Sequence, residues 1–168
     1  MNMSEVEKIA LEHDAAKLFM RWYENDTGHA IRHIWHNQPI KPDVSCQLDG
    51  DKLDIEVAHL YGSEKEAMQI LGRDLDAKTQ QELVELELVE NTHDRLIRAL
   101  NRILVNKSLK TYKSKRVWLV IRNAHPAWTT EDIHSLHDHI TVPLQHPFEQ
   151  IWMVGDMKGE SGIVQLFP

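Results

Sequence analysis

The sequence predicts a single α/β domain, residues 1–168, in which a mixed central β-sheet is flanked by helices. Three observations support this fold class: an amphipathic helical pattern near the start of the chain, two strand-like segments joined by a tight turn over residues 43–58, and a nearly all-apolar segment at 116–122. With 168 residues, 42% of them hydrophobic, the chain is long enough to bury one core. Strand and helix signals that alternate in this way are typical of layered α/β folds.

The first helix is predicted to begin after Ser4, because Ser4 and Glu7 have the spacing of a capping box. The apolar side of this helix is formed by Ala16, Phe19, Trp22 and Tyr23. The Asn-Asp-Thr-Gly run at 25–28 is expected to end the helix. Residues 30–37 then alternate in a strand-like way.

A β-hairpin is predicted next, with the Asp-Gly-Asp run at 49–51 as its turn, because glycine supplies the positive φ that tight hairpin turns need. Side chains alternate across a strand, so the apolar residues of the two strands share one face. The opposite face carries Asp43 on the first strand, and Asp54 and Glu56 on the second. We therefore expect the acids at positions 43 and 56 to converge.

A long helical region follows the hairpin. It is predicted to begin near Ser63, which has the spacing of a second capping box with Glu66. Gly72 and the polar run 76–81 favour a division of this region into two helices.

The last part of the chain reads as a strand, a helix and two more strands. Residues 116–122 are nearly all apolar, which is typical of a strand buried on both faces. A helix capped by a threonine at 129 or 130 is predicted to run to about Ile140. Two strands, 149–154 and 163–167, close the chain around a glycine-rich turn.

The hairpin carries a short motif, with Pro42-Asp43 on the first strand and Glu56-Val57-Ala58 on the second. This arrangement resembles the PD-(D/E)XK nuclease superfamily. The predicted element order begins with the six elements of that family's restriction-endonuclease-like core, α-β-β-β-α-β, and adds a C-terminal helix and two strands. The chain departs from the family pattern at Ala58, where the family usually has a lysine.

The resemblance implies a metal-dependent endonuclease that hydrolyses phosphodiester bonds of DNA. In this reading Asp43, Glu56 and the main-chain carbonyl of Val57 bind Mg²⁺ or Mn²⁺, ions that prefer hard oxygen ligands. Glu12, an acid on the apolar side of the first helix, is expected to be an accessory catalytic acid. A salt bridge from Glu12 to Lys8 or to an arginine is the alternative. Asp54 either supports this site or faces solvent.

The absence of the motif lysine leaves the function open. In the family that cation neutralises charge at the phosphate, and some members recruit a basic residue from a neighbouring element. Lys65 is the nearest candidate for this catalytic role, and Arg73 and Lys107 are others. If none reaches the site, the chain is a catalytically degenerate nuclease-fold protein that binds nucleic acid or protein. A small α/β protein with an accidental acidic hairpin is a third possibility.

Positive charge is concentrated in one part of an acidic chain. The net charge is −7, yet the segment 95–122 contains nine basic residues and no acid. Segregation of this kind builds a positive face for phosphates. The residues predicted to bind nucleic acid, taken here as DNA, are Arg95, Arg98, Arg102, Lys107, Lys110 and Lys113. The alternative is a solvated helix end whose cations suit the negative pole of the helix dipole.

The remaining sequence features indicate a cytoplasmic protein without a membrane partner. Cys46 is the single cysteine, no apolar run has the length of a membrane span, and the first residues lack the pattern of a signal peptide. A homodimer is one arrangement to expect, because cleavage of duplex DNA on two strands needs two sites.

Overall fold

A computed structural model describes residues 4–37, 40–62, 77–78, 80–82, 85 and 92–168. Six strands form one sheet in the order β1-β2-β3-β4-β5-β6. The strands are β1 (Ile31–His36), β2 (Val44–Leu48), β3 (Asp51–Leu60), β4 (Val117–Asn123), β5 (Gln150–Val154) and β6 (Ile163–Phe167). Strands β3, β4 and β5 are parallel to one another, and the other neighbouring pairs are antiparallel. The fold is therefore the mixed α/β sheet that the sequence predicts.

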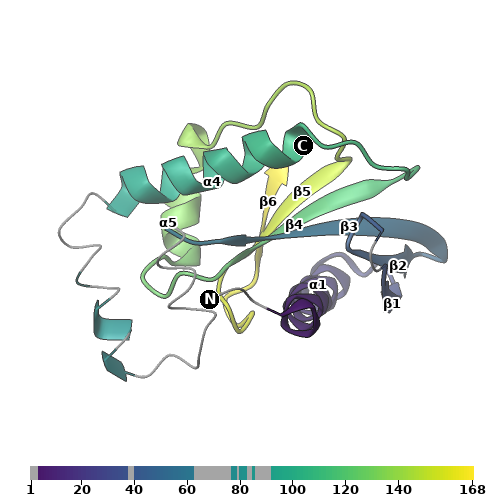
Figure 1. Ribbon diagram of the computed structural model, residues 1–168, viewed down its shortest axis with the longest axis horizontal. Helices are drawn as coiled ribbons and strands as arrows, with labels where there is room; N and C mark the ends of the chain where they lie inside the picture. Colours follow the sequence, from purple (N-terminus) through teal and green to yellow (C-terminus); the bar gives the residue numbers. More distant parts are fainter. Residues whose placement is uncertain (1–3, 38–39, 63–76, 79, 83–84, 86–91) are drawn as a thin grey trace.

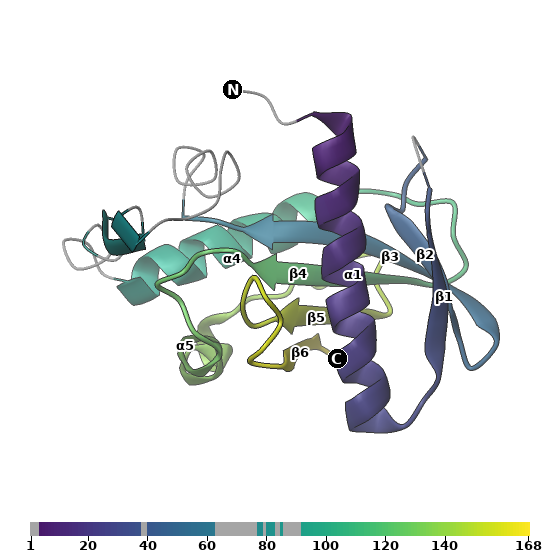
Figure 2. The same ribbon diagram turned by 90° about the horizontal axis from the view of Figure 1, so that it is seen from below.

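Helices cover the two faces of this sheet. Helix α1 (Glu5–Thr27) lies across one face, and α4 (Thr92–Ser108) lies across the other (Figure 1). The short helix α5 (Thr130–Ser135) contributes Ile133 to the core on the α4 side. Figure 2 shows α1 crossing the strands along most of its length. Each face of the sheet thus has its own apolar core.

Helix α1 has the ends that the sequence predicts. Ser4 and Glu7 form the capping box, and Gly28 closes the helix with a left-handed φ of 77°. Phe19 and Tyr23 pack against Trp118 of β4 and Trp152 of β5, with ring centroids 5.2 to 6.1 Å apart. These aromatic contacts fix α1 over the middle of the sheet.

A buried arginine also holds α1 on the sheet. The side chain of Arg122, on β4, is 0% exposed and donates to Asp14 Oδ2 at 2.6 Å and to the Leu11 carbonyl at 3.1 Å. Arg122 Nε donates to Nε2 of His59 at 3.0 Å. Burial, together with the Arg122 charge, lowers the pKa of His59 to about 3, so this imidazole is a neutral acceptor. The contact to Leu11 fixes the helical turn that carries Glu12.

The β2–β3 hairpin forms in the predicted register. Its turn has positive φ at Asp49 (50°) and Gly50 (88°), which is the backbone twist that two-residue hairpin turns favour. Ser45 pairs with Asp54. The apolar side chains of the two strands all lie in the α1-side core: Val44, Cys46, Leu48, Leu53, Ile55 and Val57. The acidic face therefore points toward α4.

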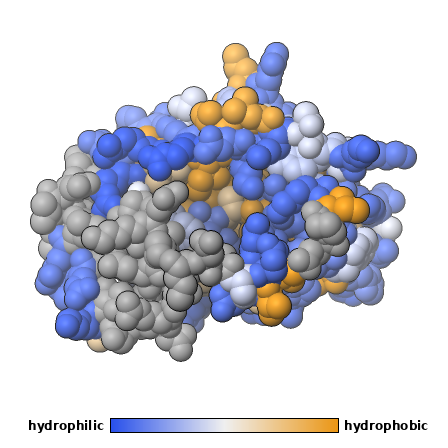
Figure 3. Space-filling view, viewed as in Figure 1, coloured by the Kyte–Doolittle hydropathy of each residue, from blue (hydrophilic) through white to orange (hydrophobic). Residues whose placement is uncertain are grey.

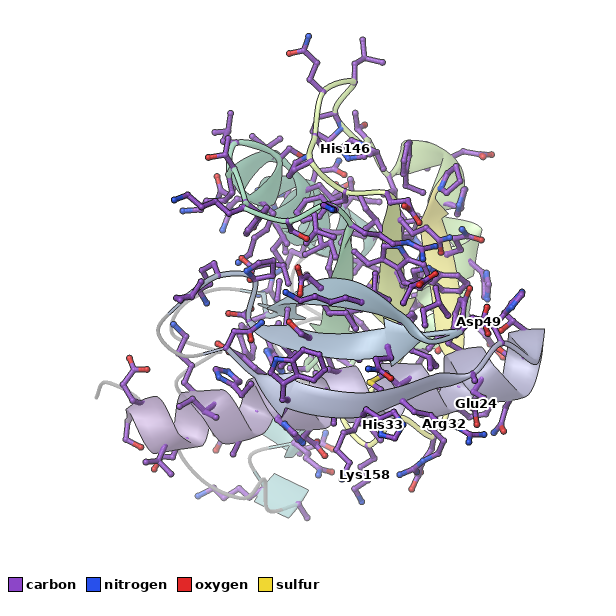
Figure 4. All side chains as sticks on the ribbon, turned by 90° about the vertical axis from the view of Figure 1, so that its right-hand side faces the viewer. Glu24, Arg32, His33, Asp49, His146 and Lys158 are labelled. Atoms are coloured by element: carbon purple, nitrogen blue, oxygen red, sulfur yellow. The ribbon has the colours of Figure 1, made fainter. Side chains whose placement is uncertain are left out.

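Strand β1 forms the edge of the sheet beside this hairpin. Its pairing with β2 shifts between Arg32 and Trp35, and His33 has a positive φ of 64°. Glu24 of α1 accepts from the Ile31 amide at 3.1 Å and from Arg32 Nε at 3.0 Å. Figure 4 shows Glu24 and Arg32 side by side at one end of α1. The edge strand is thereby tied to the helix that covers it.

The later elements follow the sequence prediction with one correction. All residues of β4 are buried, and the two closing strands are present as β5 and β6. The helix after Thr129 does not continue to Ile140: α5 ends at Ser135, and a 3₁₀ turn (His137–His139) follows. Leu136 leaves helical geometry (φ −103°, ψ 7°) while its side chain is buried, so burial of this residue outweighs continuation of the helix.

Part of the predicted helical region lies outside the described residues. This applies to the capping box of Ser63 with Glu66 and to the break at Gly72. Residues 77–78 and 80–82 are helical, and α4 forms the end of the region. Within the described residues, the helices lack an apolar stretch of the length and hydropathy needed to cross a bilayer. The face shown in Figure 3 is largely hydrophilic, with a group of hydrophobic side chains near its upper edge. Val105 of α4 and Leu109, which directly follows α4, are exposed.

Candidate active site

Asp43 and Glu56 meet on the acidic face of the hairpin. Asp43 immediately precedes β2, and its amide donates to Glu56 Oε1 at 3.3 Å. The Val57 amide donates to Asp43 Oδ2 at 2.9 Å. The two acids are 1% and 2% exposed, respectively. The hairpin register thus brings two carboxyl groups together where both are almost fully buried from solvent.

This proximity changes how the two acids hold protons. Burial and the neighbouring Asp43 raise the pKa of Glu56. Burial also acts to raise the pKa of Asp43, but hydrogen bonds from Glu56, Lys41 and the amide of residue 57 lower it overall. Two carboxylates this close disfavour simultaneous ionisation. Of the two acids, Glu56 therefore holds a proton more readily than Asp43.

Cationic and hydroxyl groups complete the surroundings of the pair. Lys107, in the last turn of α4, has Nζ 3.2 Å from Glu56 Oε2, and the Tyr112 hydroxyl donates to the same oxygen at 2.8 Å. Burial and the Glu56 carboxyl raise the pKa of Tyr112, which keeps the phenol protonated as a donor. The ammonium group of Lys41 contacts Asp43 Oδ1. One lysine thus faces each carboxyl group.

Glu12 lies at the edge of the same site. Its Oε2 is 2.9 Å from Nε2 of His36 on β1, and among the described residues neither Lys8 nor an arginine forms a salt bridge with it. Glu12, His36, Lys41 and Asp43 are among the residues that line a cavity of about 220 Å³. Nδ1 of His36 is buried and has no hydrogen-bond partner within the described part of the chain. The cavity therefore connects Glu12 of α1 to Asp43.

Asp54 supports the hairpin and does not face solvent. The residue is 5% exposed, and its carboxylate accepts from Ser45 Oγ at 2.5 Å and from Ser114 Oγ at 2.6 Å. Asn37 Nδ2 donates in turn to Ser45 Oγ at 2.5 Å. The solvent-facing alternative for Asp54 is therefore wrong.

The predicted basic residues occupy different environments. Lys65 and Arg73 lie outside the described residues. Four of the residues predicted to bind nucleic acid are exposed on α4 or just after it: Arg98, Arg102, Lys110 and Lys113. Lys107 is half-buried against Glu56, and Arg95 is buried. Only the exposed group has the accessibility that contact with a large ligand requires.

The carboxyl pair is better suited to a hard divalent cation such as Mg²⁺ than to zinc. Within the described residues, no three His, Cys, Asp or Glu side chains converge as metal ligands. Mg²⁺ does not require such a cage, because it keeps several waters and uses one or two carboxylates. The Lys41 ammonium occupies a cation position beside Asp43, and its side chain is 46% exposed and able to leave. The donor set therefore suits Mg²⁺ or Mn²⁺.

Sequence reasoning did not assign roles to Lys41, His36 and Tyr112. Lys41 directly precedes the Pro-Asp pair, and that adjacency was a usable signal. His36 and Tyr112 are brought to the site by β1 and by the loop after α4, so no local pattern marks them.

No family model, curated protein or solved structure matches the chain.

Proposed function

We propose that this protein is a metal-dependent nuclease of the PD-(D/E)XK type that hydrolyses phosphodiester bonds of DNA. One observation carries the proposal: the buried carboxyl groups of Asp43 and Glu56 lie together, with the Lys107 ammonium 3.2 Å from Glu56 Oε2. The sheet supports it further, since the acids lie on a hairpin that is followed by a parallel strand after a helix. This is the order of the family's restriction-endonuclease-like core.

In this proposal the acids of the hairpin form the ion site. Asp43 and Glu56 would hold Mg²⁺ or Mn²⁺, with the Val57 carbonyl as a further ligand. When bound, such an ion supplies Lewis-acid chemistry at the scissile phosphate. Glu56 would bind a cation in its ionised form, and the Lys107 charge and the Tyr112 hydroxyl favour that ionisation.

Lys107 is our candidate for the role of the missing motif lysine. It comes from α4, whereas the family position is occupied by Ala58 on β3. Its ammonium group is close enough to the carboxyl pair to stabilise the negative charge that develops on a phosphate there. Lys41 is a second cation at the site, and its exposed stem allows it to move aside when an ion or phosphate enters. Glu12, held by His36, lines the adjacent cavity as an accessory acid.

A specific observation favours a second function, a nuclease-fold protein that binds nucleic acid without cutting it. The two carboxyl groups are already matched by two ammonium groups, Lys41 and Lys107. A charge-compensated pair is stable without a metal ion and needs no turnover to explain it. Metal binding therefore distinguishes the two functions.

The test is calorimetric titration of Mn²⁺ together with plasmid nicking on the same samples. The wild type is compared with Asp43→Asn and Glu56→Gln, which keep side-chain size, and with Asp26→Asn, an exposed carboxylate at the far end of α1. The nuclease proposal expects the wild type and Asp26→Asn to bind Mn²⁺ and to nick plasmid. It expects Asp43→Asn and Glu56→Gln to lose both Mn²⁺ binding and nicking. Nicking that persists in Asp43→Asn would overturn it. Nucleic-acid binding without metal-dependent nicking in the wild type would support the binding protein.

A further inference from the structure

A second, larger cavity lies beside the candidate active site. It has a volume of about 820 Å³ and is formed by the start of β3 and the loop between α4 and β4. Its lining residues are Asp51, Lys52, Asp54, Tyr112, Lys113, Ser114, Lys115 and Arg116, here called the β3–loop groove. Figure 1 shows this loop passing above the β2–β3 hairpin. The volume is in the range of ligand sites.

The basic residues of the groove differ in whether they have ion-pair partners. Arg116 pairs with Glu149 at 2.8 Å, and Lys52 lies 3.8 Å from Asp54. Lys113 and Lys115 are exposed, and neither has an ion-pair partner within the described residues. The carboxylate of Asp54 is buried and accepts two serine hydroxyls, and nearby Lys52 offsets part of its charge. Asp51 adds an exposed carboxylate to the groove. The groove therefore offers two uncommitted ammonium groups.

The groove and the carboxyl pair share one residue. Tyr112 lines the groove, and its hydroxyl donates to Glu56 Oε2 at 2.8 Å. Ser114 is two positions further along the loop and donates to Asp54 at 2.6 Å. These two hydrogen bonds fix the loop that carries Lys113 and Lys115 against the strand that carries Glu56.

We infer that the β3–loop groove binds the phosphate backbone of a nucleic acid strand and leads that strand to the Asp43–Glu56 pair. This inference rests on the proposed function and names the surface by which its substrate is held. Lys113 and Lys115 contact successive phosphates, and Tyr112 marks the passage from the groove to the carboxyl pair. Contacts of this kind position a strand without reading its sequence.

Salt dependence of binding tests the inference without requiring cleavage. A fluorescent short duplex DNA is titrated with protein in EDTA at several salt concentrations. Each phosphate contact contributes about −0.9 to the slope of log K against log salt, so Lys113→Ala/Lys115→Ala should reduce that slope by about 1.8. The matched control is Lys17→Ala/Arg21→Ala, which removes two exposed cations from the outer side of α1 and should leave the slope unchanged.

Equal slopes for the wild type and the Lys113/Lys115 variant would overturn the inference. So would equal displacement of the DNA by polyphosphate and by polyglutamate, because that result would make the groove a general site for acidic polymers, proteins included. Failure of the proposed function is a separate result. If the Lys113/Lys115 variant has the smaller slope but the wild type never nicks DNA, the groove inference stands and the nuclease proposal fails. If the wild type nicks DNA and the two slopes are equal, the nuclease proposal stands and the groove inference fails.

Discussion

Lys107 of α4 and Glu56 of β3, which are 51 positions apart in the chain, form an ion pair with Nζ 3.2 Å from Oε2. The pair joins the helix that covers one face of the sheet to the strand that carries Glu56, the buried partner of Asp43. Because Ala58 has no charge, this contact is the means by which a cation reaches the carboxyl pair from α4.

Replacement of Lys107 by alanine should reduce plasmid nicking by roughly 10²-fold, the size of effect that follows loss of one charge-stabilising donor. Lys107→Arg keeps the charge and should retain more activity. The control is Lys158→Ala, an exposed lysine in the turn between β5 and β6, which removes the same charge without touching Glu56. Equal losses in Lys107→Ala and Lys158→Ala would contradict a specific role for Lys107.

Glu56→Gln should become more stable than the wild type as the pH rises, when no metal is present. The folded protein raises the pKa of Glu56 above its ordinary value of 4.5 and so binds this proton more tightly than the unfolded chain. Wild-type stability from this group therefore falls as pH rises through 4.5 and levels off above the folded pKa. Glutamine resembles the protonated form and avoids this fall.

The measurement is urea unfolding of the wild type and Glu56→Gln at a series of pH values in EDTA. The control is Glu160→Gln, an exposed carboxyl in the turn between β5 and β6, whose stability should follow the wild type. A constant difference between Glu56→Gln and the wild type across this pH range would show that folding does not raise the pKa of Glu56.

Arg122→Met should destabilise the fold by about 1–3 kcal/mol, because it leaves the acceptor nitrogen of His59 and two main-chain carbonyls without their donor. The guanidinium contacts Asp14, His59 and main-chain carbonyls of α1 and the β5–β6 turn. Arg21→Met, an exposed arginine on α1, should change stability by no more than about 0.5 kcal/mol.

The pKa of His59 gives a second, independent measurement of the effect of Arg122→Met. Burial and the Arg122 charge lower the pKa of His59 to about 3. Removal of the charge should raise that pKa, while burial keeps it below the ordinary value of 6.5. An NMR titration of His59 in the variant measures this, and an unchanged pKa would contradict the electrostatic contribution of Arg122.

Gly28→Ala should destabilise the protein by about 1 kcal/mol, because an L side chain is disfavoured at a φ of 77°. Space is not the cause, since a Cβ at this position meets no atom within 4 Å. Gly28→Asn should be less harmful, because asparagine tolerates the left-handed region. Thermal unfolding of the two variants makes the comparison, and an Asn variant less stable than the Ala variant would point to a cause other than backbone strain.

Local patterns in the sequence predicted much of the fold. Ser4 with Glu7 and Gly28 mark the ends of α1, and the Asp-Gly-Asp run at 49–51 marks the hairpin turn. These features depend on hydrogen bonds and backbone angles within a few residues, so they can be predicted without knowledge of the rest of the chain. The alternation that placed the acids of the hairpin on one face has the same short range. The early end of α5 at Ser135 could not be predicted from the sequence, because it depends on the burial of Leu136 against distant residues.

By itself, the sequence determined that this chain forms helices and strands in a mixed α/β order and that its hairpin carries Asp43, Asp54 and Glu56 on one face. Tertiary structure alone decided which groups meet those acids. Lys107 reaches Glu56 because α4 docks on the acidic face, and His36 reaches Glu12 because β1 lies at the edge beside α1. The physical reason is range: periodicity and turn chemistry act between neighbours, whereas the partners of a buried charge are set by how whole elements pack.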